Sequence, residues 1–134
     1  MKLLDFYPII VTEKLADCRD FYVRWFGLSP VFESSWFVLL ASDEGQASLA
    51  FMSPDHPSAP PGPETFDGRG MCLEFQVENA AEEAVKFQDV GLGLPLTDEP
   101  FGQRRFGLFD PAGTWIDVVE QIEPQQGWWD QYMV

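Results

Sequence analysis

One acidic residue, Asp117, stands among apolar neighbours in the stretch FDPAGTWIDVV, residues 109–119. The DPAG segment is typical of a turn, and the residues after it are typical of a strand. In a strand, Asp117 shares a face with Trp115, while Ile116 and Val118 point to the other side. Because Ile116 and Val118 need a core to pack against, Asp117 must point to the opposite face; if that face lines a cavity, Asp117 could hold a metal, take a proton or meet a cationic ligand. The alternative is an acid in contact with water.

A second acid, Glu74, alternates with apolar residues in MCLEFQV, residues 71–77. It could act as a base or anchor a cation, or it could be a hydrogen-bonded structural acid. Arg105 lies in the strand before the turn, where it could grip an anionic group or neutralise Asp117 or Glu74. These two roles of Arg105 predict opposite ligand charges. Trp115 beside Asp117 would form an aromatic wall for a flat or cationic ligand.

The only histidine, His56, lies in a proline-rich stretch. Loop histidines are mostly exposed and without a role, but this one is the only ordinary acid or base that titrates near neutral pH. The candidate catalytic residues are therefore Glu74, Asp117 and His56.

The composition limits the class of protein. The chain of 134 residues is 46% hydrophobic, which is typical of one packed domain or two small modules that share a core. Its net charge of -14 disfavours nucleic acid as a partner and favours neutral or cationic small ligands. No apolar run is long enough to span a bilayer. Cys18 and Cys72 are interpreted as buried thiols, so we expect a soluble cytoplasmic protein.

The order of predicted elements occurs twice. A strand, a helix that ends at a glycine and three further strands are predicted first within residues 1–52 and again within residues 71–123. Residues 53–70 form a Pro- and Gly-rich connecting loop, and residues 124–134 form an aromatic tail. The predicted strands are 6–12, 30–33, 36–41, 46–52, 71–77, 93–96, 104–109 and 115–121, with helices over 14–26 and 80–90. This pattern indicates an α+β protein built from two βαβββ modules.

Three segments resemble the vicinal oxygen chelate superfamily, which includes glyoxalase I, bleomycin-resistance proteins and extradiol dioxygenases. They are PIIVTEKLADCRDFYVRWFGL, LEFQVENAAEEAVKFQDVGL and PFGQRRFGLFDPAGTWIDVV, and together they span nearly the whole chain. The resemblance implies that the two βαβββ modules form cupped mixed sheets around a cavity, and that the face of the strand carrying Asp117 lines this cavity.

Catalytic members of this superfamily hold a divalent metal with four side chains. The resemblance puts the corresponding positions at Tyr7, near Ala50, at Cys72 and at Asp117. Only Asp117 is a good ligand for a hard divalent ion, because Ala50 has no donor atom and Tyr7 would have to lose a proton first. We therefore expect no bound metal and no other cofactor. Glu74 together with Asp117 is the alternative ligand pair.

The resemblance leaves three hypotheses of function. The first is a bleomycin-resistance-like protein that sequesters a planar or cationic small molecule in a cavity between modules, without chemistry. The second is a metal-dependent glyoxalase-like lyase, isomerase or dioxygenase with a rearranged site. The third is an interaction module that uses its aromatic tail. We also expect a homodimer, because superfamily members often pair modules across two chains. The predicted ligand-binding residues are Tyr7, Ala50, Cys72, Glu74, Arg105, Trp115 and Asp117.

Overall fold

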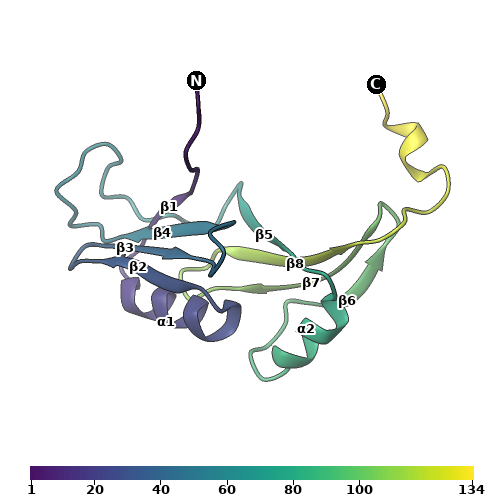
Figure 1. Cartoon of the computed structure of the whole chain (residues 1–134), viewed down its shortest axis with the longest axis horizontal. Coiled ribbons are helices and arrows are strands. Elements are labelled where there is room, and N and C mark those ends of the chain that lie inside the picture. The colour runs from purple at the N-terminus through teal and green to yellow at the C-terminus, as the bar shows by residue number, and fades with distance from the viewer. The chain divides into compact units, whose positions relative to one another are not determined.

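The computed structural model describes all 134 residues and divides the chain into two compact units. The first unit comprises Met1–Arg69 with Pro111–Gly113, and the second comprises Gly70–Asp110 with Thr114–Val134. Each unit contains one four-stranded sheet and one α-helix (Figure 1).

The first unit has the chain order strand, helix and three strands. Its sheet has the strand order β1-β4-β3-β2, in which β1 is parallel to β4 and the other neighbours are antiparallel. The helix packs on the sheet through Tyr22, whose ring centroid lies 5.5 Å from that of Phe51. The elements are β1 (Ile9–Val11), α1 (Leu15–Phe26), β2 (Ser29–Glu33), β3 (Phe37–Ala41) and β4 (Ser48–Met52).

The second unit repeats this plan. Its sheet has the order β5-β8-β7-β6, with β5 parallel to β8 and antiparallel pairs elsewhere. The helix covers one face, where Phe87 at its end packs against Phe106 at a centroid distance of 5.4 Å. The elements are β5 (Cys72–Gln76), α2 (Ala80–Lys86), β6 (Leu94–Glu99), β7 (Gln103–Phe109), β8 (Trp115–Gln121) and the 3-10 helix η1 (Trp128–Gln131).

The helix ends follow from local sequence. Asn79 caps α2, because its side-chain oxygen accepts a hydrogen bond from the Glu82 N–H at 3.1 Å. Gly27 ends α1 in the left-handed conformation at φ 66°, which costs glycine little. The second helix is shorter than predicted, since it ends at Lys86 and residues 87–90 form turns instead of a last helical turn before Gly91.

The prediction of an α+β protein with two βαβββ modules is confirmed. Residues 53–70 contain no helix or strand, and the Phe66 N–H in this stretch donates to the Val11 carbonyl oxygen at 3.0 Å. The longest helix, α1, has 12 residues, and no helix has the length and apolar character that crossing a membrane requires.

Candidate functional site

The two faces of the β5-β8-β7-β6 sheet differ in chemistry. Ile116 and Val118 are buried on the face that α2 covers, as their spacing predicted. Asp117 points to the opposite face, and the strand register places Glu74 and Gly107 directly beside it. We call this the Asp117 face and define it by Cys72, Glu74, Glu99, Gln103, Arg105, Gly107, Trp115 and Asp117.

Asp117 is buried, with 6% of its surface exposed, and both of its carboxylate oxygens are engaged. Oδ1 accepts a hydrogen bond from Nε1 of Trp115 at 2.9 Å. Oδ2 accepts one from Nη1 of Arg105 at 3.2 Å. A buried carboxylate requires such partners, because desolvation of an unpaired charge is costly. Asp117 therefore fixes the two side chains that flank it.

Arg105 is shared between two acids. Besides its bond to Asp117, the guanidinium contacts Glu99, whose Oε1 lies 3.4 Å from Nε of Arg105. The guanidinium carbon lies 5.7 Å from the centre of the Phe101 ring, within cation–π range. The neighbouring Arg104 points to the other face of the sheet, where it pairs with Asp98 at 2.7 Å. Of the two arginines, Arg105 is thus the one that neutralises Asp117.

Trp115 lies flat against the sheet because two glycines leave room for it. A Cβ atom at Gly107 would overlap the indole ring, and one at Gly93 would come within 2.7 Å of it. The ring of Phe109 meets the indole edge-on at a centroid distance of 5.0 Å. Since the indole N–H is bound to Asp117, Trp115 is held in one orientation and forms a fixed aromatic shelf.

Glu74 is the most available acid on this face. It is exposed, and its Oε1 accepts one hydrogen bond, from Nε2 of Gln103 at 3.1 Å. No side chain of the protein binds Oε2, which leaves this oxygen for a ligand. Cys72, two residues earlier on the same strand, has a pKa above its ordinary value because of partial burial and the nearby charges of Asp117 and Glu74.

The Asp117 face carries a net negative charge. It carries the three carboxylates of Glu74, Glu99 and Asp117 but only one guanidinium, that of Arg105. An excess of acid favours a cationic ligand over an anionic one.

The remaining predicted residues lie in the first unit. Ala50 is fully buried in β4, and Tyr7 precedes β1 with 37% of its surface exposed. The His56 side chain contacts its own loop, where Nε2 lies 3.3 Å from the Gly62 carbonyl oxygen.

The prediction of two buried thiols is wrong for one of them: Cys18 is buried, but Cys72 is exposed because it lies on the edge strand β5.

The residues at the superfamily's metal positions do not fit a divalent ion. Both oxygens of Asp117 are taken by Trp115 and Arg105, and a guanidinium beside the carboxylate repels a cation. Ala50 has no donor atom. No three His, Cys, Asp or Glu side chains come together as a metal site would require.

Three residues of the site were missed in the sequence. Glu99 pairs with Gln103 in the β6–β7 register, which brings it to Arg105. Phe101 lies in the turn between these strands, and Gly107 lies opposite Asp117. A glycine at an alternating position inside a predicted strand was the one available signal, since it marks a close approach of another group.

The profile of the Glyoxalase/Bleomycin resistance protein/Dioxygenase superfamily matches residues 5–118. The chain belongs to this superfamily. This match confirms the resemblance seen in the sequence. No functionally curated protein matches the chain in sequence.

Several solved structures share the fold of this chain. A lactoylglutathione lyase from Agrobacterium tumefaciens has a TM-score of 0.70 at 19% identity, covering 90% of this chain and 95% of its own. TnmS3, an antibiotic binding protein from Streptomyces sp. CB03234, has a TM-score of 0.66 at 18% identity, covering 86% and 93%. A superfamily protein from Nocardioides has a TM-score of 0.70 at 16% identity, covering 92% and 86%. At these identities only the fold is shown to be shared, and the reaction or ligand is a separate question.

Proposed function

We propose that this superfamily member binds a small planar cation on the Asp117 face and sequesters it without chemistry and without a metal. The observation that carries the proposal is the presence of an exposed acid, Glu74, and the fixed aromatic shelf of Trp115 on the same negatively charged face, with Asp117 between them in the strand register. A flat cation stacks on the indole and places its charge against the open oxygen of Glu74.

The four polar side chains divide this work. Glu74 meets the ligand, and Gln103 orients the carboxylate through its hydrogen bond to Oε1. Asp117 acts through Trp115, whose ring it locks in place. Arg105 neutralises Asp117, so that the unbalanced charge of the face is concentrated on Glu74 and Glu99.

A role in antibiotic resistance is part of the proposal. The structural neighbour TnmS3 is an antibiotic binding protein of the same fold, which supports sequestration of a bioactive molecule. We propose a cytoplasmic location for this role, supported by the absence of a disulfide at Cys18 and Cys72.

Calorimetric titration with benzamidine, a planar monocation, tests the function, and benzoate serves as the anion of matched shape. We expect benzamidine to bind and to raise the melting temperature, because a ligand that binds only the folded state stabilises it. Binding of benzoate with equal affinity, or of neither compound, would contradict the proposal.

Metal analysis of protein purified without chelator separates sequestration from a glyoxalase-like lyase or dioxygenase. We expect substoichiometric zinc, nickel, manganese and iron, because the donor set around Asp117 is occupied by Arg105 and Trp115. Near-stoichiometric metal that is lost in Glu74→Gln would favour the enzyme.

We also propose that the chain forms a homodimer. The N-terminal residues Leu3, Leu4 and Phe6 are 72%, 88% and 85% exposed. Several exposed apolar side chains close together in one segment are typical of a surface that another chain covers. Sedimentation equilibrium tests this: a species of 15.2 kDa at every concentration would contradict it.

A further inference from the structure

The C-terminal segment is attached to the turn between β6 and β7. The Gln125 N–H donates to the Pro100 carbonyl oxygen at 2.9 Å, and Nε1 of Trp129 donates to the Phe101 carbonyl oxygen at 2.9 Å. The segment is therefore held at the start of β7, which also carries Arg105.

Four aromatic rings gather at this attachment. Trp128 lies at centroid distances of 5.7 Å from Phe101, 4.8 Å from Trp129 and 5.1 Å from Tyr132. We call Phe101, Trp128, Trp129 and Tyr132 the tail cluster. Trp129 and Tyr132 are 44% and 57% exposed, so the cluster presents aromatic surface to solvent.

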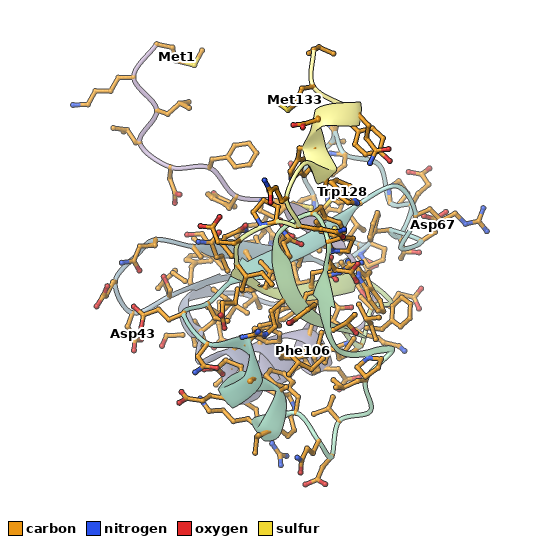
Figure 2. All side chains as sticks on the ribbon, turned by 90° about the vertical axis from the view of Figure 1, so that its right-hand side faces the viewer. Met1, Asp43, Asp67, Phe106, Trp128 and Met133 are labelled. Carbon is orange, nitrogen blue, oxygen red and sulfur yellow. The ribbon has the colours of Figure 1, made fainter.

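The tail cluster lies on the same side of the sheet as the Asp117 face. In Figure 1, α2 lies below the second sheet and η1 lies above its end. Figure 2 shows the same arrangement from the side, with Trp128 above the sheet and Phe106, which packs against Phe87 after α2, below it. The tail is thus on the face that α2 leaves open.

Arg105 connects the two aromatic groups. Its guanidinium contacts Asp117, which holds Trp115, and lies over the ring of Phe101, which contacts Trp128. Gly107 beneath the Trp115 indole and Arg105 are two residues apart on β7. With a rise of about 3.4 Å per strand residue and the reach of an arginine side chain, the two groups are roughly 10–15 Å apart.

We propose that the tail cluster is a second aromatic subsite, and that the ligand is an elongated cation with a planar group at each end. This inference rests on the proposed function, since the Trp115 shelf and Glu74 form the first subsite. The charge between the two subsites is negative, because Glu99 and Asp117 outweigh Arg105. Asp130 adds a carboxylate within η1, between the two ring-bearing residues Trp129 and Tyr132 in sequence.

Dications with two benzamidine groups joined by alkyl linkers test the second subsite, with benzamidine as the short probe. We expect the best dication to bind the whole chain at least tenfold more tightly than benzamidine. Affinity should pass through a maximum as the linker grows from three to six methylene groups, because only one length matches the spacing.

Variants of the tail assign the gain to the cluster. Trp128→Leu should abolish the advantage of the dication and leave the affinity for benzamidine unchanged. Tyr132→Ala should reduce the advantage several-fold, and because Tyr132 is 57% exposed this variant keeps the fold intact if Trp128→Leu does not. Trp25→Leu in α1, in the first unit, is the matched control and should change neither affinity.

The outcomes separate the two proposals. If neither probe binds, the proposed function fails and the second subsite fails with it. If both probes bind with equal affinity, or if the dication keeps its advantage in Trp128→Leu and in Tyr132→Ala, the tail cluster is no subsite, while the site at Trp115 and Glu74 stands.

Discussion

The indole ring of Trp115 lies against the backbone of Gly107, in a space that the absence of a side chain at residue 107 creates. The contact crosses two antiparallel strands, because Gly107 pairs with Asp117 and the ring extends from Trp115 on the same face. The hydrogen bond from Nε1 of Trp115 to Asp117 fixes the ring in that space. A strand glycine and a buried acid thus define one aromatic surface.

Gly107→Ala should displace the Trp115 ring. The added methyl group overlaps the indole, and overpacking of this kind costs about 1–3 kcal/mol in the free energy of unfolding. Urea denaturation measures this cost, and benzamidine titration should show lost affinity. Gly62→Ala is the control, because its methyl group meets only the flexible side chain of Glu64. Equal stability and affinity in Gly107→Ala and wild type would contradict the assigned packing.

Asp117→Ala should destabilise the protein more than Asp117→Asn does. Alanine leaves the Trp115 N–H and the Arg105 guanidinium without their shared acceptor, at a cost of about 1–3 kcal/mol. Asparagine keeps one oxygen as the acceptor for the indole N–H, but its amide NH2 cannot accept from Arg105, so this variant loses one hydrogen bond and the charge where alanine loses both hydrogen bonds. Asp98→Asn is the control, since the pair of Asp98 with Arg104 is exposed to solvent and its loss should lower the urea midpoint less than Asp117→Ala does. Identical midpoints for the two Asp117 variants would show that the hydrogen bond from the Trp115 indole contributes nothing.

Glu74→Gln should weaken benzamidine binding about tenfold, which corresponds to about 1.4 kcal/mol, while the melting temperature of the free protein stays unchanged. The reason is that Glu74 is exposed and has one hydrogen bond, from Gln103, so its charge serves the ligand and not the fold. Glu78→Gln, at an exposed position just after the same strand, is the matched control and should bind as wild type does. Equal loss in both variants would mean that only the overall charge attracts the ligand.

The fold followed from the sequence because its signals are local. The period-two alternation around Ile116 and Val118, the cap at Asn79 and the stop at Gly27 each depend on near neighbours in the chain. The end of α2 was mispredicted, since helical periodicity continued to residue 90 while the chain turns after Lys86. Propensity alone does not decide where tertiary packing ends a helix.

Only part of the site was predictable from the sequence, because strand register decides which side chains meet Asp117. That Asp117 faces away from Ile116 and Val118 was predictable from alternation, but its ion pair with Arg105 depends on a pairing across β7 and β8. The sequence left two roles for Arg105 open, and geometry decides for neutralisation. Nothing in the sequence indicated that Phe101 belongs to the site, because a turn residue has no periodicity that would place it beside a guanidinium.

Cys72 should react slowly with iodoacetamide near neutral pH, although it is exposed. Partial burial and the negative charges of Asp117 and Glu74 raise the pKa of its thiol, so the reactive thiolate is scarce. The native thiol keeps its proton to higher pH than the unfolded one. Its contribution to stability is therefore complete below the unfolded pKa and is lost as the pH rises through the folded pKa.

Peptide mapping by mass spectrometry after timed alkylation checks this. The rate at Cys72 in the native protein should lie below that in the urea-unfolded chain at pH 8, and the ratio of the two rates should approach one as the pH is raised further, because both thiols then ionise. Glu74→Gln should speed the native reaction, because it removes one of the charges that raise the pKa of the thiol. Cys18 is the internal control, since full burial protects it until the protein unfolds. A native Cys72 that reacts faster than the unfolded thiol would mean that Arg105, and not the acids, controls its charge.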